Sequence, residues 1–582
     1  SKLGTTYVTG SAVLSQDLQG AFTPALTVTV GPGVAVSLLI VALLFLSPVA
    51  AIIPVLMGGI SISIALAAIY VGIVKISHGT ITFLTPTLTI LLVLGLAVDY
   101  AVLQLRRTRE ERLNGHSTED SVGISVKWAG QAVLTAGVTV IVAYIVMAVA
   151  NVPLFSDVGV AIAIGVSVLL AASLTLLPAL ELSLRDRIFW PGLHRQMKRK
   201  SVSKNRLDKL ARATLKRKVI IAITISAVAV SAFYFTYTTP TGSDFLKLIP
   251  NFPSNQGLTV ITNNLGSGTI APATIILTTP DPIVQGNGQF NQTVMNQIEM
   301  ISNAVANSSG VVSISGPTRP YGSAFNYNSL DNLSQPVRIQ YLSGIDSYIG
   351  KDNKTALINA GLSSSSESQA AINSLLGMES NVQKVHLSNG DTLYFGGDTQ
   401  GTYDSNSFLN TLLPQIILIL AAAVYVILFI QLRSALTPVR LIFTILCSVI
   451  FSLAILSIVF YYSLNLPVLN FAPLFVVVTM LGVGIDYDIF FVTRIREEVL
   501  NGKSDTEAIV TAVDRVWVTI LGLGLVLSTV FASLLITGIA ILQEISLAVS
   551  AAILVDVLVV ILFFVPSLMG LAQRWNWWPT LI

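Results

Sequence analysis

Charged residues are scarce in this sequence. Only 11% of the 582 residues are Asp, Glu, Lys or Arg, whereas 53% are hydrophobic. A soluble globular domain has about one quarter charged residues. The composition therefore predicts a membrane protein. The net charge of +3 is spread between apolar runs, so no basic domain is present to bind nucleic acid.

Cysteine and histidine are also rare. The single cysteine, Cys447, lies in an apolar run, and the four histidines are scattered. This excludes a disulfide framework and a clustered-cysteine metal site. The sequence has neither a His-Glu-x-x-His zinc pattern nor a phosphate-binding Gly-x-x-x-x-Gly-Lys loop. We therefore expect no metal, no bound cofactor and no ATP-driven or hydrolytic chemistry, and we expect that the protein is not an enzyme.

Long apolar runs dominate the sequence instead. A helix of about 20 apolar residues crosses the roughly 30 Å hydrocarbon layer of a bilayer. Eleven such runs predict eleven spans, near 34–53, 55–74, 86–105, 129–150, 158–180, 219–238, 411–431, 439–462, 471–493, 516–537 and 545–567.

The positions of Lys and Arg predict the orientation of these spans. Of the 33 basic residues, 25 lie in the segments 106–127, 185–218, 433–440, 494–515 and at Arg574. Threading eleven spans places all five on one side, and cytoplasmic loops are the ones enriched in Lys and Arg. We therefore expect a multi-pass protein of the cell membrane. Its domains would be the end of a first extracytoplasmic domain (1–33), a five-span bundle (34–182), a basic cytoplasmic linker (183–218), a span (219–238), a second extracytoplasmic domain (239–408), a second five-span bundle (409–567) and a cytoplasmic C-terminus (568–582).

The segment 239–408 has the composition of an external domain. It holds 17 charged residues in 170. It also contains four N-x-Ser/Thr sequences that are candidates for glycosylation, at Asn291, Asn307, Asn332 and Asn353. β-rich runs near 272–279, 310–315, 355–361 and 392–397 alternate with helical patterns near 288–306 and 366–385. The order βαββαβ predicts an α+β domain of the split βαβ, ferredoxin-like type.

An internal repeat links the two ends of the chain. With a shift of 387 residues, Pro86–Gly115 and Pro473–Gly502 are identical at 12 of 30 positions, including Asp99 with Asp486 and Tyr100 with Tyr487. The repeat gives the span at 219–238 no counterpart in the first half. We therefore expect an intact protein of twelve spans and two external domains, with the remainder supplied by a longer product or by a partner chain. The chain begins at Ser1, with neither an initiator Met nor a signal peptide.

Four aspartates within the spans are the candidate functional residues. Asp99, Asp486, Asp488 and Asp556 lie in apolar runs, where a carboxylate is costly unless it faces a partner or a cavity. The adjacent Tyr100 and Tyr487 can hydrogen-bond a carboxyl group in either protonation state. The two Asp-Tyr pairs indicate either a proton relay or polar contacts that only fix helix packing. Asp488 lies about 200° from Asp486 around a helix, so Asp488 and Asp556 are secondary candidates.

Several neighbouring features qualify this interpretation. Gly95 and Gly482 lie four residues before Asp99 and Asp486, on the same helical face, and would let the two helices approach closely. The charged runs RRTREERLNG and TRIREEVLNG follow the two spans and either couple the halves or anchor the span ends as interfacial helices. The basic linker is either solvated or bound to lipid headgroups. Glu544 and Asp157 are interpreted as hydrated helix starts.

These sequences resemble the resistance-nodulation-division superfamily, and within it the MMPL-like branch. The resemblance rests on GLAVDY at 95–100, GVGIDYDIFFVTRIREE at 482–498, LLPAL at 176–180 with FWPG at 189–192, VPSLMGLAQRWNWWP at 565–579 and SDFLKLIPNFPSNQG at 243–257. It implies export of lipids or other hydrophobic molecules driven by the proton gradient, with Asp99, Tyr100, Asp486 and Tyr487 as the relay. In that family the Asp of the last span is commonly followed by a basic residue, whereas Asp556 is followed by VLVVILFF.

The residues leave two further classes of function open. A lipid sensor of the sterol-sensing type would share the spans without needing the Asp-Tyr pairs. A non-transporting scaffold within a larger complex would not need them either. The expected partners are membrane lipids, a hydrophobic substrate, the chain or segment that completes the repeat, and further copies of this chain in a homo-oligomer.

Overall fold

The chain forms two compact units. The computed structural model describes residues 6–76, 81–82, 84–150, 155–191, 206–242, 252–265, 268, 271–286, 288–388 and 390–579. One unit, called here the helical unit, comprises residues 19–240 and 411–582, and the other, the α+β unit, comprises residues 1–18 and 241–410. Part of the predicted basic linker and the first half of the segment 243–257 lie outside the described residues.

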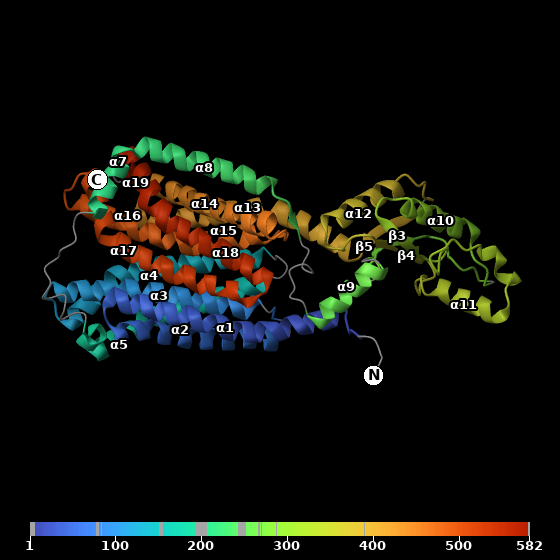
Figure 1. Ribbon diagram of the computed structural model, residues 1–582, viewed down its shortest axis with the longest axis horizontal. Helices are drawn as coiled ribbons and strands as arrows, with labels where there is room; N and C mark the ends of the chain where they lie inside the picture. The colour runs from blue at the N-terminus through green and yellow to red at the C-terminus, as the bar shows by residue number, and fades with distance from the viewer. Residues whose placement is uncertain are drawn as a thin grey trace. The chain divides into compact units, whose positions relative to one another are not determined.

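The helical unit is a bundle of long helices (Figure 1). Its elements include α1 (Ser11–Phe45), α2 (Pro48–Ile69), η1 (Tyr70–Ile76), α3 (Leu84–Leu113), α4 (Thr118–Val149), α5 (Ser156–Leu184), η2 (Arg185–Phe189), α7 (Arg206–Lys216), α8 (Lys218–Thr238), α13 (Asp398–Leu432), α14 (Leu436–Ser457), η6 (Ile458–Ser463), β6 (Val468–Leu469), α15 (Ala472–Thr479), η7 (Met480–Gly484), α16 (Ile485–Leu500), α17 (Asp505–Ala532), η8 (Ser533–Thr537), α18 (Ala540–Val555), η9 (Asp556–Phe564), α19 (Val565–Ala572) and η10 (Gln573–Trp577).

The helical unit confirms the prediction of a polytopic membrane protein. Within the described part of the chain, ten helices are long and apolar enough to cross a bilayer. The first of the eleven predicted spans corresponds to α1, whose described apolar stretch is the shorter Thr29–Phe45. The exterior of α8 is strongly apolar, with Tyr237 80% and Val230 70% exposed, as expected for a surface that contacts lipid tails.

The predicted limits of the first two spans, 34–53 and 55–74, are wrong. The chain breaks at Leu46, after which Ser47 caps the next helix by accepting a hydrogen bond from the N–H of Ala50. Pro48 occupies the first position of α2, where its missing N–H costs nothing. Hydropathy alone does not detect this break, because the sequence is apolar both before and after it. The helices α1 and α13 also begin earlier than predicted, at Ser11 and Asp398.

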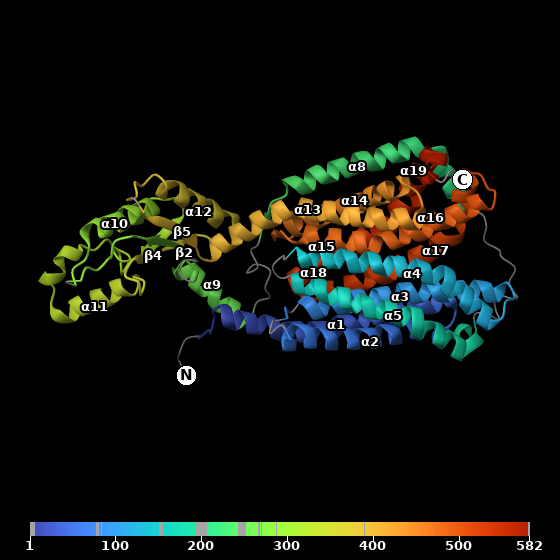
Figure 2. The same cartoon turned by 180° about the vertical axis from the view of Figure 1, so that it is seen from behind.

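Helix packing places α3 and the continuous span Ala472–Leu500 at the centre of the bundle. In each, 89% of the most apolar stretch is buried, against 11% in α8. Figures 1 and 2 show α2 to α5 gathered on one side and α14 to α18 on the other. The two helices that carry the Asp-Tyr pairs are thus the two most enclosed by protein, which supplies the surroundings that a carboxyl group in a membrane needs.

Local geometry recurs at positions 387 or 388 residues apart. The hydroxyl of Ser47 donates to the carbonyl oxygen of Ile188 at 2.5 Å, and that of Ser434 donates to the carbonyl oxygen of Asn576 at 2.6 Å. The residue before each serine has a positive φ, 52° and 50°. In both places the end of a long helix is therefore fastened in the same way to the last turns of its half.

The α+β unit is built around one antiparallel sheet. Its elements are β1 (Thr241–Gly242), α9 (Pro253–Leu265), β2 (Ala273–Thr278), α10 (Gln292–Ala306), β3 (Val311–Ser315), η5 (Tyr327–Asn332), α11 (Gln335–Asp346), β4 (Thr355–Leu362), α12 (Gln369–Val382) and β5 (Thr392–Gly396). Four strands form a sheet in the order β3-β4-β2-β5. In the centre of the sheet, Ile275 lies opposite Ile358 on β4 and Phe395 on β5.

The helices α10 and α12 cover the buried side of this sheet (Figure 2). Alternate residues of β2 are buried, as a strand with one covered face requires. Ile275 and Leu277 on the sheet join Ile298 of α10 and Leu375 of α12 in one apolar core. The amphipathic patterns of the helices and strands are therefore satisfied within this unit.

Two of the four predicted glycosylation positions have structural roles. The side-chain nitrogen of Asn353 donates to the carbonyl oxygen of Val284 at 2.6 Å, and its oxygen accepts from the N–H of Val284 at 2.8 Å. A glycan on that nitrogen would break this contact, so the prediction for Asn353 conflicts with the fold. Asn291 caps α10, whereas Asn307 and Asn332 are exposed.

Candidate functional site

One hydrogen bond joins the Asp-Tyr pairs across the two halves of the helical unit. The hydroxyl of Tyr487, on α16, donates to Oδ2 of Asp99, on α3, at 2.8 Å. Both side chains are buried, with 3% and 4% of their surface exposed. Asp99 therefore pairs with the tyrosine of the opposite repeat rather than with its sequence neighbour Tyr100. Because donor and acceptor come from different halves, this hydrogen bond depends on how the two halves pack against each other.

The reciprocal bond is absent from the described structure. The hydroxyl of Tyr100 is buried and has no hydrogen-bond partner there. Asp486 is partly exposed, and its Oδ1 also lacks a partner, as does Oδ1 of Asp99. The negative charges of Asp99 and Asp486 act on each other. The site thus holds one engaged and one open Asp-Tyr pair.

A π-helical turn distinguishes the Asp-bearing helix of the second half from that of the first. η7 (Met480–Gly484) immediately precedes Asp486, whereas α3 is α-helical throughout. A π-turn inserts one residue into the helical repeat and rotates the residues that follow. A Cβ at Gly484 would lie 2.7 Å from Cε of Met480, so a larger residue there would displace the end of that side chain. The position of Gly484 is occupied by Ala97 in the first half.

Asp488 and Asp556 belong to a second cluster. Asp556 accepts a hydrogen bond from Ser448 at 2.8 Å, and both Asp488 and Asp556 are fully buried. The charge of Arg440, on α14, acts on Asp488. Arg440 is itself held by Asn576, whose Oδ1 lies 2.5 Å from its Nη1. The basic residue that acts on this cluster, through Asp488, therefore comes from α14 rather than from the last span.

Four participating or neighbouring polar residues were not identified from the sequence. They are Arg440, Ser448, Tyr144 and Thr479. The hydroxyls of Tyr144 and Thr479 form a buried hydrogen bond of 2.8 Å between α4 and α15. Ser448 and Thr479 resemble the many hydroxyl residues of apolar helices that bond only to their own backbone. Arg440 lies next to a predicted cytoplasmic loop, where a basic residue has an ordinary explanation.

The interpretation of Glu544 as a hydrated helix start is wrong. Its side chain is fully buried, and Oε2 accepts a hydrogen bond from the backbone N–H of Leu469 at 3.0 Å. The carboxyl group secures a loop between two spans. Its position near the predicted end of a span favours exposure, but the loop that contains Leu469 donates a hydrogen bond to it.

The glycines predicted to bring the two Asp-bearing helices together pack elsewhere. A Cβ on Gly95 would clash with Leu527 of α17. A Cβ on Gly482 would lie 3.3 Å from Cβ of Ala143, on α4. Each glycine therefore allows close packing with a helix of the opposite half, but not with the other Asp-bearing helix.

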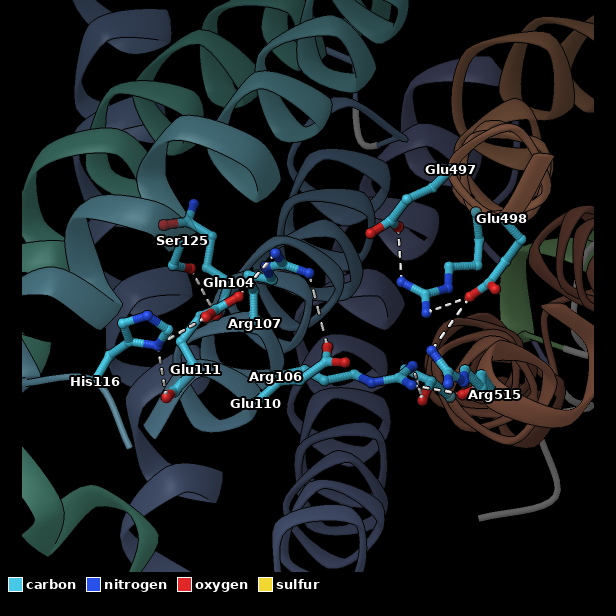
Figure 3. A network of polar contacts seen from close by, with 12 residues as sticks. Gln104, Arg106, Arg107, Glu110, Glu111, His116, Ser125, Glu497, Glu498 and Arg515 are labelled. Atoms are coloured by element: carbon cyan, nitrogen blue, oxygen red, sulfur yellow. Dashed lines mark hydrogen bonds and ion pairs between the residues drawn. The ribbon is translucent and has the colours of Figure 1, made fainter. Parts of the chain in front are cut away.

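The first charged run couples the halves (Figure 3). α3 continues through RRTREERL without a break, so this run does not form a separate interfacial helix. From it, Arg106 donates to the carbonyl oxygen of Arg515 at 2.6 Å and to the hydroxyl of Thr519, both on α17. The same end of the second Asp-bearing helix carries Arg494 and Glu498, which form an ion pair of 2.7 Å.

No metal centre accompanies these carboxylates in the part of the chain that the structure describes. No group of three or more His, Cys, Asp or Glu side chains there is arranged to hold a metal ion. The aspartates are instead contacted by hydroxyl groups and by one guanidinium charge. Such partners suit a carboxyl group that changes protonation state.

Comparison with known proteins identifies the family. The MMPL family model matches residues 3–217 and 253–582. This chain belongs to the MMPL family. Both Asp-Tyr pairs lie within the matched residues.

Its relatives include named exporters. The chain is 25% identical over 560 residues to the putative membrane protein ActII-3 of Streptomyces coelicolor, which covers 94% of this chain and 70% of that protein. It is 24% identical to the mycolic acid-containing lipids exporter MmpL11 of Mycolicibacterium smegmatis, over 93% of this chain and 54% of the relative. The apo-petrobactin exporter of Bacillus anthracis is 23% identical over 93% of this chain and 70% of its own length. The chain thus spans about half to 70% of these relatives.

Proposed function

We propose that this MMPL family protein is a secondary active transporter that exports lipid-like or other hydrophobic molecules and is driven by the proton gradient. The observation that carries the proposal is the hydrogen bond between Tyr487 and Asp99, because it links the two halves through a titratable group. The names of its relatives support a hydrophobic or amphipathic substrate. No bound cofactor is proposed, since the gradient itself supplies the energy.

The proposed relay works through the charge of Asp99. A hydrogen bond to an ionised carboxylate contributes about 1.5–3 kcal/mol, roughly twice the value for a neutral pair. Protonation of Asp99 removes that charge and weakens the bond from Tyr487. The two halves can then move relative to each other, and Tyr100 and Asp486 can form the reciprocal hydrogen bond in the new arrangement. Asp488 and Asp556 would pass protons through the second cluster.

The membrane orientation is also part of the proposal. We place the α+β unit outside the cytoplasm and the C-terminus inside, on the distribution of Lys and Arg. The strand order β3-β4-β2-β5 with helices after β2 and β4 supports assignment of that unit to the ferredoxin-like class. The recurring geometry at Ser47 and Ser434 supports an internal repeat.

The decisive experiment separates proton coupling from folding. The protein is reconstituted in vesicles with an imposed pH gradient, and movement of a fluorescent phospholipid and of protons is recorded. Asp99→Asn and Asp486→Asn keep the side-chain shape but remove titration. We expect each to lower gradient-dependent transport at least tenfold while the thermal unfolding profile remains close to that of the wild type.

The matched control is Asp514→Asn on α17, the same chemical change outside the two carboxylate clusters. It should transport as the wild type does. Equal transport by wild type and both relay variants would refute proton coupling through these residues and would favour the lipid sensor or the scaffold.

A further inference from the structure

A large cavity lies at the end of the bundle that carries the charged runs. Its volume is about 710 Å³, and its walls come from α3, α4, α13, α16 and α17. This volume lies within the range of small-molecule sites, roughly 300–1,000 Å³. The aspartate clusters are not among its lining residues. It is therefore a separate feature from the proposed relay.

The lining of this cavity carries excess positive charge. Six arginines and two glutamates line it. The arginines are Arg106, Arg107, Arg433, Arg494, Arg496 and Arg515. A concave surface with one dominant sign concentrates ions of the opposite sign. The cavity is thus complementary to an anion.

The internal ion pairs do not remove this excess. Glu498 is shared by Arg494 at 2.7 Å, Lys503 at 2.7 Å and Arg515 at 3.2 Å. Three cations therefore share Glu498, while Arg494 also pairs with Glu497 at 2.7 Å and Arg107 pairs with Glu111 at 2.8 Å (Figure 3). The six lining arginines still outnumber the carboxylates that pair with them. The charges of Arg106 and Arg494 also repel each other, as do those of Arg433 and Arg496. An anion between these groups would relieve both repulsions.

Buried polar atoms without partners point to a ligand with a hydroxyl-bearing headgroup. Nε of Arg494 and Nε of Arg496 are buried donors that have no hydrogen-bond partner among the described residues. Oε1 of Gln431 is a buried acceptor that also has no hydrogen-bond partner among the described residues. Leaving such a group unpaired costs about 1–3 kcal/mol. A phosphate oxygen suits the two guanidinium groups and a hydroxyl group suits the amide of Gln431, since all three residues line the cavity.

Most of the other lining residues are apolar, and two of them are well exposed. Leu103, Phe490 and Val516 line the cavity. Trp128 and Leu500 also line it, with 61% and 63% of their surfaces exposed. Exposed tryptophan is typical of the boundary between lipid tails and headgroups. A free phosphate ion would make no use of these side chains, whereas a glycerol backbone and the first part of an acyl chain would.

We propose that this cavity binds an anionic phospholipid, with the phosphate and a headgroup hydroxyl among the arginines and Gln431, and the acyl chains against Trp128 and Leu500. The site joins α3 and α4 of the first half to α13, α16 and α17 of the second. The bound lipid would bridge the two halves at the end of the bundle that carries the charged runs. It would contact no relay residue and would stabilise the packing of the halves. This binding does not depend on the proposed proton-driven transport.

The test is direct binding to the full chain in neutral detergent. The probes are dihexanoyl phosphatidylglycerol, dihexanoyl phosphatidylcholine and inorganic phosphate. We expect the first to bind at least tenfold more tightly than the other two and to raise the unfolding temperature. Equal binding of both lipids would overturn the proposal, because it would show that the surface binds acyl chains without selecting an anionic headgroup. Inorganic phosphate that binds as tightly as phosphatidylglycerol would also overturn it.

Two variants locate the binding. Ala132→Trp fills the cavity from α4 and should abolish phosphatidylglycerol binding, whereas Leu134→Trp, on the same helix but outside the cavity, should not. The double variant Arg433→Gln, Arg515→Gln should weaken binding at least tenfold, while Glu498 keeps Arg494 and Lys503 as partners. Unchanged binding in Ala132→Trp would place the lipid elsewhere and refute the assignment.

Discussion

At the scale of single residues, the site is asymmetric although its sequence is repeated. The hydroxyl of Tyr487 has a partner in Asp99, but that of Tyr100 has none in the described structure. The two tyrosines therefore contribute differently to the stability of the fold. Removing a bonded hydroxyl leaves a buried carboxylate oxygen unpaired, whereas removing an unpaired hydroxyl costs little.

This difference gives a first prediction. Tyr487→Phe should lower the free energy of unfolding by about 1.5–3 kcal/mol, since it deletes a hydrogen bond to a carboxyl group. Tyr100→Phe should leave it nearly unchanged, because it removes a buried hydroxyl that has no partner in the described structure. Chemical unfolding in detergent measures both. Equal losses for the two variants would show that the asymmetry does not hold in solution.

A second prediction concerns Asp556. Ser448→Ala removes the one donor that Asp556 has among the described residues, so the unfolding free energy should fall by about 1–3 kcal/mol. Ser452→Ala is the matched control on the same helix. The hydroxyl of Ser452 bonds only to a backbone carbonyl in its own turn, and its loss should cost less. A larger loss in the control would contradict this assignment.

At the scale of elements, glycines and π-turns decide how closely helices pack. Gly159 brings α5 against the backbone of α4, since a Cβ there would lie 2.6 Å from the carbonyl oxygen of Tyr144 and 2.9 Å from the nitrogen of Ala148. Backbone atoms cannot move aside as a flexible side chain can. This contact therefore fixes the separation of the two helices and the position of Tyr144.

The element-scale prediction follows from that contact. Gly159→Ala should destabilise the protein by about 1–3 kcal/mol, as overpacking does, and should disturb the bond between Tyr144 and Thr479. Gly123→Ala on α4 meets no neighbour within 4 Å and should be neutral or slightly stabilising. Thermal unfolding of both variants tests this, and similar behaviour of the two would refute the close contact.

At the scale of the whole molecule, the proposed orientation can be tested with cysteine labelling. Cys447 is 3% exposed, so the wild type should react poorly with a membrane-impermeant maleimide. Asn307→Cys in the α+β unit should be labelled from outside intact cells. Asn114→Cys and Asn501→Cys, after the charged runs, should be labelled only once the membrane is opened. The reverse pattern would overturn the orientation.

Much of this molecule could be predicted from its sequence. Apolar runs identified the spans because the length of a crossing helix is set by the bilayer, and alternating patterns placed the strands within a residue or two of β2 to β5. The aspartates were conspicuous because carboxyl groups are rare in spans. The break at Ser47 was missed because the helices on both sides are equally apolar.

The sequence by itself determined which groups are expensive to bury, and hence the four aspartates and two tyrosines. Only the tertiary structure decided their partners. The pairing of Tyr487 with Asp99, the approach of Arg440 to Asp488 and the burial of Glu544 join residues far apart in the chain. Such pairings depend on helix rotation, which a single π-turn changes, and on the close contacts that particular glycines permit.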